Sequence, residues 1–304
     1  MNEQDTPETL VAGLVDLLTV SRKSEDAYAA EPQPGGIGRV FGGQVVAQAL
    51  QAAQASVPDD LVAHSLHAYF LRGGEEGPPI DLSIARDFDG RSFANRRVVA
   101  SQTDKDGTPR PILNLTASFQ RPEEGLSHEA SPMPDVPPPE ELLTDAEVRR
   151  QFLEDMPNVP EDQRNWALRP RPIEMRNTNP VDWRESEPRE PEAAMWLRTV
   201  ASLPDDPAIH RAVIAYASDY SLLGTAALPH GISFMRGEIK GASLDHAVWF
   251  HAPARADEWL LYVTDSPWSG GGRGFNRGRI FTRDGRLIAS TAQEGVLRQT
   301  HKKR

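Results

Sequence analysis

Asp219 is a carboxylate in an apolar setting, where it could take part in chemistry or serve a structural purpose. It falls in the middle of the apolar stretch 215–228, although Asp has a poor helix propensity. One structural explanation exposes Asp219 on the outer face of a helix. Another makes Ser218-Asp219 the cap of a second helix that begins near Tyr220. The capping position is compatible with catalysis, because it places a carboxylate beside free backbone N–H groups.

The sequence around Gln293 and Ser243 says less about their roles than the sequence around Asp219 does. Segment 287–297 alternates like a β-strand and puts Gln293 on its mostly apolar face. A Gln there must find hydrogen-bond partners or cost about 1–3 kcal/mol, so it either bonds to neighbouring backbone or binds a fixed water. Ser243 lies near the expected start of a strand, where hydroxyls commonly bond to local backbone. It is not a nucleophile of the Gly-x-Ser-x-Gly type, because that motif does not surround it.

The histidines and the glycine-rich segment 269–274 resemble binding motifs without matching them. His64 and His67 are three residues apart and His246 and His251 five, and odd spacing in a strand sends paired side chains to opposite faces. We therefore predict structural histidines, no metal and no cofactor. The glycine-rich segment lacks the Lys-Ser/Thr of a phosphate loop and indicates a hairpin connection. Around it lie the arginines of a basic patch that could bind phosphates: Arg273, Arg277, Arg279, Arg283 and Arg286.

Composition narrows the class of protein. The 304 residues are 38% hydrophobic and 25% charged, as in a soluble globular chain, and the net charge of −11 argues against binding to nucleic acid or anionic membranes. No apolar run approaches the ~20 residues of a membrane span, and the polar, acidic start is not a signal peptide. The absence of cysteine excludes disulfides, thiolate nucleophiles and cysteine-ligated metals. We expect a cytoplasmic protein.

The elements that must position these residues fall into two similar halves. Prolines and acidic residues crowd the segment 122–139, which begins a bridge that runs to about residue 190. Within it we expect a short helix in 140–156 and a short strand at 173–176. The predicted domains are therefore 1–121, a proline-rich structured linker at 122–190, and 191–304.

An internal repeat supports this division. Residues 67–71 match 246–250, residues 91–93 match 273–275, and residues 114–118 match 289–293. Each series follows an Ala-rich helical segment, 45–55 in the first half and 208–228 in the second.

Capping and turn residues predict where the helix of the second half begins and where hairpins turn in each half. Asp206-Pro207 gives the second helix its N-cap and first residue, and 104–107 and Asp284-Gly285 provide hairpin turns. The pattern predicts an α+β fold, compatible with a tandem (double) hotdog in which a curved antiparallel sheet wraps each long apolar helix. Pattern alone does not separate this fold from other α+β repeats.

Ordered motifs along nearly the whole chain resemble the acyl-CoA thioesterase II family. The resemblance runs from about residue 10 to residue 298 and is weakest in the bridge. Its motifs are 40–50 (VFGGQVVAQAL), 64–72 (HSLHAYFLR), 216–219 (YASD), 229–232 (PHGI), 244–251 (LDHAVWFH), 258–262 (EWLLY) and 289–295 (ASTAQEG). The resemblance implies a double-hotdog enzyme that hydrolyses acyl-CoA to free CoA and a carboxylic acid, in fatty acid metabolism.

The resemblance also implies roles for particular residues. A carboxylate, a hydroxyl and an amide hold the attacking water in the family, and these map to Asp219, Ser243 and Gln293. Thr is common at the hydroxyl position, so Ser243 is a departure that keeps the hydrogen-bonding group. Arg273 and Arg277 become candidate contacts to the CoA phosphates of the substrate. The family and the exposed sheet edges indicate a homo-oligomer, a dimer or a tetramer.

The repeat predicts one site in each chain. The positions matched to the three catalytic candidates in the first half are approximately Gly42, His64 and Ser118, which do not restore the set. Two alternatives remain. One is a non-catalytic acyl-CoA-binding protein on the same fold. The other is a hotdog enoyl-CoA hydratase or dehydratase, for which Asn179-Pro180 is a weak signal, since it lies in the bridge with no His close behind.

Overall fold

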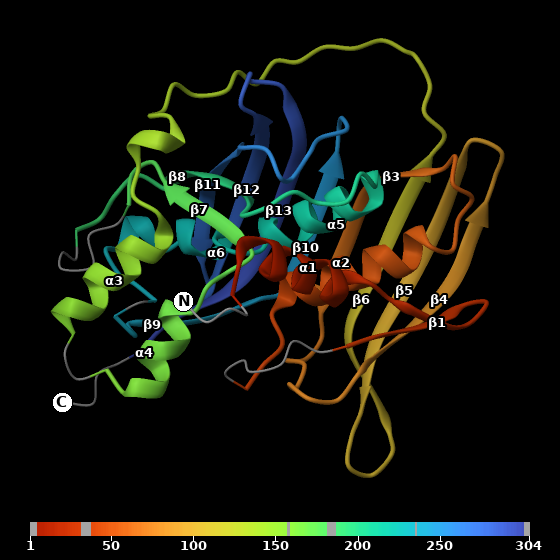
Figure 1. Cartoon of the computed structure of the whole chain (residues 1–304), viewed down its shortest axis with the longest axis horizontal. Helices are drawn as coiled ribbons and strands as arrows, with labels where there is room; N and C mark the ends of the chain where they lie inside the picture. Colours follow the sequence, from red (N-terminus) through yellow and green to blue (C-terminus); the bar gives the residue numbers. More distant parts are fainter. Residues whose placement is uncertain (1–4, 32–37, 157–158, 181–186, 235, 301–304) are drawn as a thin grey trace.

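The computed structural model describes residues 5–31, 38–156, 159–180, 187–234 and 236–300. Within these residues, thirteen strands form one continuous antiparallel sheet (Figure 1). The strands are β1 (Ser21–Ser24), β2 (Ala27–Ala30), β3 (Val62–Phe70), β4 (Ile80–Asp89), β5 (Phe93–Thr103), β6 (Pro109–Gln120), β7 (Ile173–Asn177), β8 (Glu192–Thr199), β9 (Ile239–Ser243), β10 (Asp245–Phe250), β11 (Leu260–Gly270), β12 (Arg273–Thr282) and β13 (Leu287–Gln299).

The strand order divides the sheet into two halves that meet at its middle. It runs β1-β2-β4-β5-β6-β3-β10-β13-β12-β11-β8-β7, and β9 pairs with β13 off this path. The join is the antiparallel pair of β3 and β10, in which His67 lies opposite Ala247. Each half contributes one central helix, α2 (Gly42–Gln54) or α5 (Pro207–Ser218), and these two helices pack against each other. The expected α+β plan is therefore present.

The further helices lie outside this central pair. They are α1 (Pro7–Leu18), α3 (Asp145–Asp155), α4 (Glu161–Leu168), α6 (Leu222–Thr225) and the 3-10 turns Pro139–Glu141 and Leu228–His230. Within the described part of the chain, no helix is both long and apolar enough to cross a membrane.

Helix α5 begins as predicted and ends earlier than predicted. Asp206 caps it by accepting a hydrogen bond from the N–H of Ala208, and Pro207 is its first residue. The expected helix over 208–228 breaks at Asp219, which is the C-cap of α5 in a right-handed conformation. The chain then continues as the short helix α6. Asp219 is therefore neither on the outer face of a helix nor the N-cap of a second one.

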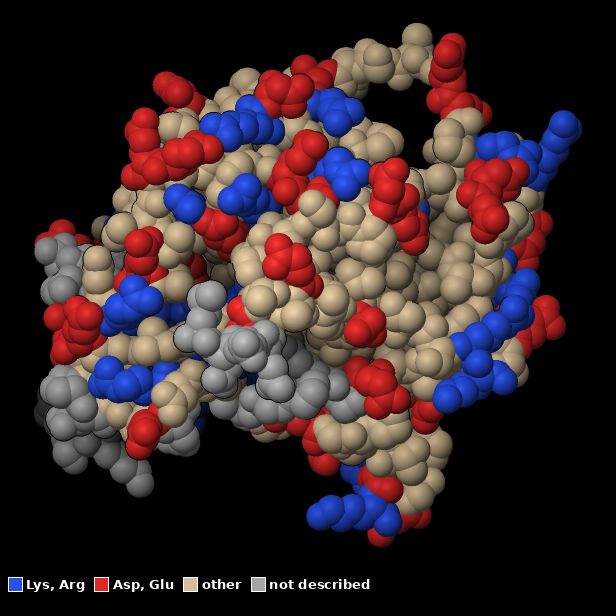
Figure 2. Space-filling view, viewed as in Figure 1, with Lys and Arg blue, Asp and Glu red and all other residues tan. Residues whose placement is uncertain are grey.

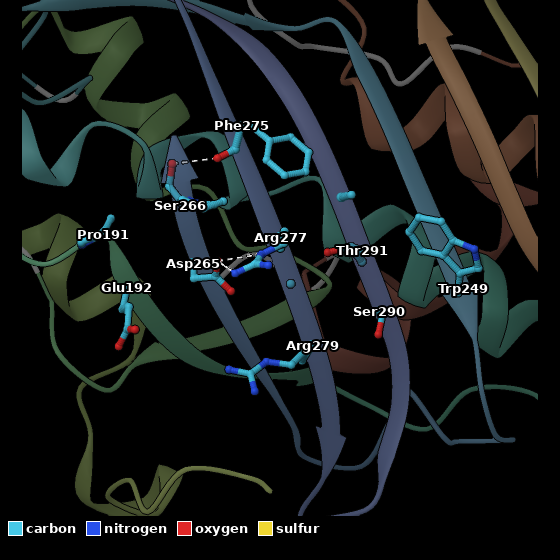
Figure 3. Close-up of a pocket in the computed structure, with 13 residues that line it drawn as sticks. Pro191, Glu192, Trp249, Asp265, Ser266, Phe275, Arg277, Arg279, Ser290 and Thr291 are labelled. Atoms are coloured by element: carbon cyan, nitrogen blue, oxygen red, sulfur yellow. Dashed lines mark hydrogen bonds and ion pairs between the residues drawn. The ribbon is translucent and has the colours of Figure 1, made fainter. Parts of the chain in front are cut away.

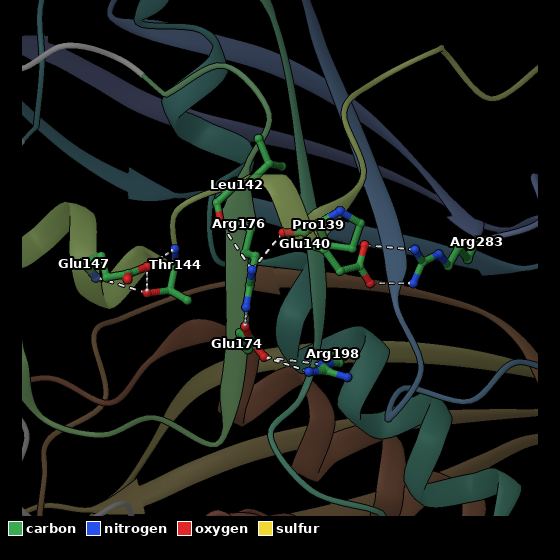
Figure 4. Close-up of polar contacts among 9 residues, drawn as sticks. All are labelled: Pro139, Glu140, Leu142, Thr144, Glu147, Glu174, Arg176, Arg198 and Arg283. Carbon is green, nitrogen blue, oxygen red and sulfur yellow. Dashed lines mark hydrogen bonds and ion pairs between the residues drawn. The ribbon is translucent and has the colours of Figure 1, made fainter.

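The bridge packs on the outside of the C-terminal half. Residues 121–138 have no regular structure and form a strap that arches over the top of the molecule (Figures 1 and 2). Helix α3 begins with a Thr144–Glu147 capping box, and α4 was not predicted. Figure 4 shows how polar contacts tie the bridge to the sheet, where Glu140 pairs with Arg283 and Glu174 pairs with Arg198. Strand β7 lies within the predicted bridge and pairs with β8.

The internal repeat is present, but its strands align one residue away from the predicted match, or two residues away for the match of 91–93 with 273–275. Leu71 and His251 occupy equivalent places, because their N–H groups donate to Ile112 and Ile288 at the same point of each half. Counting back five residues makes Leu66, not His67, the counterpart of His246. The sequence match put His67 there because both are histidines, yet His67 points out of the sheet and His246 is fully buried.

The same alignment changes the counterparts of Gln293 and Asp219. Thr116 and Ala292 are equivalent through their partners His67 and Ala247, so Ala117 replaces Ser118 as the counterpart of Gln293. At the helix ends, Ser56 and Ser218 each donate a hydrogen bond to a carbonyl three residues back. The position after Ser56 is Val57. Gly42 lies at the opposite end of α2 and is not the counterpart of Asp219.

Candidate active site

The candidate site lies where the end of α5 meets the beginning of α2. Asp219 is half-buried as a residue, and its carboxylate is surrounded by groups from both halves of the chain. The N–H of Gly43, in the first turn of α2, hydrogen-bonds to this carboxylate. The start of a helix presents free N–H groups and the positive end of the helix dipole. The site therefore needs both halves.

Two glycines make this approach possible. A Cβ atom on Gly42 would lie 2.7 Å from Asp219 Oδ2 and 2.9 Å from the Phe70 ring, and one on Gly43 would lie 2.4 Å from the carbonyl oxygen of Tyr216. All three distances are shorter than a real Cβ contact allows. Gly42-Gly43 is therefore where the backbone of α2 comes close to the carboxylate and to α5.

The three predicted catalytic residues come together around one carboxylate oxygen. Gln293, on β13, points into the interior and donates from Nε2 to Asp219 Oδ1 at 2.6 Å. Ser243 donates from Oγ to the same oxygen at 3.3 Å. Ser243 ends β9 rather than starting a strand, and it pairs with Gly295 of β13. This pairing brings the hydroxyl close to the amide on the neighbouring strand.

Burial dominates the electrostatics of Asp219. Loss of water raises the pKa of its carboxyl from 3.8 to about 6, although the hydrogen bonds from Gln293, Gly43 and Ser243 each favour the charged form. The raised pKa stays below neutrality, so the carboxylate is ionised at pH 7 and can still accept a proton. A carboxylate with a pKa near the working pH is suited to general base catalysis.

His246 extends the network behind Gln293. It is fully buried on β10, and burial lowers its pKa to about 4, so the ring is neutral at pH 7. Its Nδ1 atom lies 3.2 Å from Gln293 Nε2, and its Nε2 atom lies 2.8 Å from Ser218 Oγ. The sequence predicts a structural role for His246 and does not include it among the site residues. Its buried, inward position was not readable from the spacing of the histidines.

The structure does not bring Arg273 and Arg277 to this carboxylate. Arg273 pairs with Glu294 at 3.3 Å, and Arg277 pairs with Asp265 at 2.7 Å. Figure 3 shows Arg277 and Arg279 beside an open hollow of about 740 Å³ on β11–β13. Ser290 and Ala292, which line it, alternate along β13 with the inward-facing Gln293. Segment 269–274 is the predicted hairpin connection between β11 and β12, with Gly271 and Gly272 at positive φ.

As a chemical unit, the site can hold a small polar molecule and remove a proton from it. The two side-chain donors share Oδ1, while Oδ2 lies against the first turn of α2. Gln293 Oε1 is buried and has no hydrogen-bond partner among the described residues. A buried acceptor of this kind favours a donor such as water, because leaving it unpaired costs about 1–3 kcal/mol.

Comparisons with known proteins agree with the resemblance found in the sequence. A family model described as "Acyl-CoA thioesterase" matches residues 178–296, and one described as "Acyl-CoA thioesterase N-terminal domain" matches residues 31–120. The chain is 44% identical to acyl-coenzyme A thioesterase 8 of Rattus norvegicus, over 86% of this chain and 80% of that protein. It is 37% identical to acyl-CoA thioesterase 2 of Haemophilus influenzae, over 95% of this chain and 98% of that one.

Solved structures agree as well. Acyl-CoA thioesterase II TesB2 from Mycobacterium marinum is 35% identical, with a TM-score of 0.74 over 94% of this chain and 98% of that one. A protein from Alicyclobacillus acidocaldarius described as having a hot dog fold is 19% identical, with a TM-score of 0.72 over 95% of this chain and 99% of that one. The latter supports the fold alone. Because relatives above 30% identity are matched over most of their length, the chain belongs to the acyl-CoA thioesterase family.

Proposed function

We propose that the chain hydrolyses acyl-CoA thioesters to free CoA and a carboxylic acid, with Asp219, Ser243 and Gln293 as catalytic residues. One observation carries the proposal. A carboxylate with a pKa raised to about 6 is held by a hydroxyl and an amide beside the glycine-lined start of a helix. Names of similar proteins supply the substrate class.

The first step is attack by water on the thioester carbonyl carbon. Ser243 and Gln293 fix the water, and the carboxylate of Asp219 takes its proton as the new carbon–oxygen bond forms. The carbonyl oxygen becomes an oxyanion. The N–H of Gly42, the first residue of α2, stabilises this charge, because the Gly43 N–H is already bonded to Asp219 and a donor fixed in the first helical turn needs no reorganisation.

The second step breaks the carbon–sulfur bond. The tetrahedral intermediate collapses to the carboxylic acid, the electron pair leaves with the sulfur of CoA, and the proton held by Asp219 passes to that thiolate. Each cycle therefore returns Asp219 to its ionised form. Direct attack by Asp219 would instead form an anhydride that water then hydrolyses. Incorporation of ¹⁸O from labelled water into Asp219 during a single turnover would establish the anhydride route with attack at the Asp219 carbonyl carbon, because direct attack of water on the thioester exchanges no oxygen of Asp219.

We further propose that the two halves are tandem hotdog units, with α2 and α5 as their central helices. Four consecutive antiparallel strands of its own half follow each helix in the chain, β3–β6 or β10–β13, and the additional strand β9 lies between α5 and β10. The equivalent hydrogen bonds at Leu71 and His251 support this division.

The test is release of free thiol from a panel of acyl-CoAs, read against hydration of enoyl-CoA on the same preparation. We expect thiol release that depends on Asp219 and no hydration. Hydration without thiol release would favour the hydratase alternative. Tight acyl-CoA binding with neither reaction would favour the non-catalytic alternative.

A further inference from the structure

The hydrogen atoms in the network behind Gln293 can be assigned one by one. The Ser218 hydroxyl carries one hydrogen and donates it to the carbonyl oxygen of Ala215 at 3.0 Å. We assign the hydroxyl hydrogen to this bond, so that Ser218 Oγ accepts at its 2.8 Å contact with His246 and the imidazole hydrogen lies on Nε2. Because the ring is neutral, Nδ1 carries no hydrogen and can only accept.

This tautomer decides which way round the Gln293 amide sits. An acceptor at Nδ1 requires an N–H donor at 3.2 Å, so the NH₂ group of Gln293 faces His246. The second hydrogen of that NH₂ group reaches Asp219 Oδ1. The reversed amide would set its oxygen against two acceptors at once, the imidazole Nδ1 and the carboxylate. Both hydrogens of the amide are then used, and Oε1 is left as the acceptor that the network does not fill.

We propose that His246 is a positioning residue for hydrolysis, which fixes the Gln293 amide with its NH₂ group on Asp219 and its oxygen free to accept from the attacking water. The inference rests on the proposed function. The geometry is specific to the C-terminal half, because the counterparts Leu66 and Ala117 are both apolar. Figure 1 shows β10 and β13, which carry His246 and Gln293, running side by side in the sheet.

The proposal predicts how the pKa of Asp219 responds to His246. The groups hydrogen-bonded to the carboxylate are Gln293 on β13, Ser243 on β9 and the Gly43 N–H on α2, and the Tyr262 phenol on β11 interacts with it electrostatically. The Gln293 donor lowers the pKa of Asp219. Without an acceptor behind it the amide can turn, and the carboxylate then loses this donor. Replacing a neutral imidazole by a neutral side chain changes no charge, so a higher pKa of Asp219 reports the lost hydrogen bond.

Three substitutions of His246 distinguish the contribution of Nδ1 from that of Nε2. His246→Asn keeps an acceptor at the place of Nδ1, because its Oδ1 is also two bonds from Cβ. His246→Gln places its amide further out, where Nε2 contacts Ser218, and provides no acceptor at the Nδ1 position. His246→Leu keeps neither and installs the residue found at the counterpart position. We expect the Leu and Gln variants to lower kcat about ten- to a hundredfold with little change in KM, as loss of an orienting partner typically does.

Two measurements complete the test. The first is the acidic limb of the kcat–pH profile, which should move to higher pH for Leu and Gln and stay in place for Asn. The second is NMR titration of the Asp219 carboxyl carbon, which needs no turnover and should show the same order. If wild type hydrolyses no acyl-CoA while the titration behaves as expected, the proposed function fails and the positioning stands. A Leu variant with unchanged kcat and unchanged Asp219 pKa overturns the proposal, as does an Asn variant impaired as much as Leu. Thermal unfolding of each variant identifies any that does not fold.

Discussion

The molecule contains two junctions between its central helices, and they differ in chemistry more than in construction. At one, the end of α5 meets the beginning of α2, and the contact consists of Asp219, Gly42 and Gly43. At the other, the end of α2 meets the beginning of α5, and Gln54 bonds to the carbonyl oxygen of Ala208 and to Arg211. The same helix pair therefore offers two helix starts. A carboxylate and a glycine opening occur at the first junction.

The strands beneath the two junctions also differ in polarity. His246 and Gln293 face the interior in the C-terminal half, and their counterparts Leu66 and Ala117 are apolar. The N-terminal half still contributes to the site, since Gly43 donates a backbone hydrogen bond to Asp219. The fold therefore provides the scaffold twice, and in the proposed mechanism a few polar side chains decide which junction can carry out chemistry.

Asp219→Asn should have the largest effect and make the first junction as inert as the second. The amide keeps the size of the carboxylate but cannot take a proton at neutral pH. We expect kcat to fall by about a thousandfold or more, judging from general-base and nucleophile deletions. Acyl-CoA binding, measured by calorimetry, should stay within about threefold. Near-wild-type turnover would rule out Asp219 as base and as nucleophile together.

The same variant should not lose stability. The pKa of Asp219 is raised from 3.8 to about 6, so ionising this carboxyl opposes folding by about 3 kcal/mol above pH 6. Below the unfolded pKa of about 4 this opposing contribution is absent. Asn removes the charge, and the Tm at pH 7.5 should equal or exceed that of wild type. A strongly lowered Tm would attribute the lost activity to unfolding instead.

Gly42→Ala should cost less activity than Asp219→Asn, by closing the opening between the helices. The new Cβ would lie 2.7 Å from Asp219 Oδ2 and 2.9 Å from the Phe70 ring, so the carboxylate must move. Because a displacement of about 1 Å can cost about a hundredfold in rate, we expect a fall of that order in kcat. The matched control is Gly13→Ala on the exposed side of α1, where a Cβ meets nothing within 4 Å. Equal activity of both variants would contradict the close approach.

The hydroxyl and the amide should act as one unit, so their losses should not add. If Ser243→Ala and Gln293→Ala each lower kcat/KM about tenfold to a hundredfold, the double variant should cost little more than the worse single one. The reason is that a water held by only one of the two side chains is no longer fixed. Gln293→Ala also installs the residue of the counterpart position, Ala117. Losses that multiply would show that the two side chains do not share a water.

Ser243→Thr is the complementary control for that experiment. Thr keeps the hydroxyl, and its extra methyl restricts the side-chain rotamer. Turnover should be retained or rise. An inactive Thr variant would mean that the position has been assigned the wrong role.

The pH dependence of kcat should report the titration of Asp219 at the first junction. The expected change in rate is smaller than for the substitutions above. The proposed mechanism requires the ionised carboxylate, and the pKa of Asp219 is raised to about 6. In kcat, the rate should be constant above pH 7 and fall about tenfold per pH unit below about pH 6. His246 should not contribute, because burial lowers its pKa to about 4. A profile flat down to pH 5 would exclude Asp219 as the titrating base.

The sequence predicts the elements better than the contacts between them. The capped start of α5, the hairpin turns and the strand alternation that turns Gln293 inward all follow local rules, and the structure confirms them. The approach of Gly43 to Asp219 does not, since these residues are far apart in the chain. The proposed role of His246 does not follow from local rules either. The sequence match suggested His67 as the counterpart of His246, because both are histidines, whereas the sheet aligns His246 with Leu66. The oligomeric state stays a prediction, to be measured by light scattering.

Arg277 should give the smallest effect, and the comparison between the halves supplies its control. Arg277 and Arg97 occupy equivalent strand positions, and each pairs with an aspartate on the neighbouring strand, Asp265 or Asp87. Such pairs on exposed sheet faces contribute little to stability. If Arg277 also contacts a CoA phosphate, Arg277→Gln should raise the KM for acyl-CoA while Arg97→Gln should not.

The expected rise is about two- to fivefold, which corresponds to the roughly 0.5–1 kcal/mol of one solvent-screened ionic contact. The decisive measurement repeats both variants, and Arg273→Gln, on an acyl-N-acetylcysteamine thioester, which lacks the phosphates. There the KM should be the same for every variant and wild type, because no phosphate is present to bind. A KM that rises equally on both substrates would mean that Arg277 acts through the structure of the sheet and not through a CoA phosphate. The phosphates of CoA would then have to bind elsewhere on the molecule.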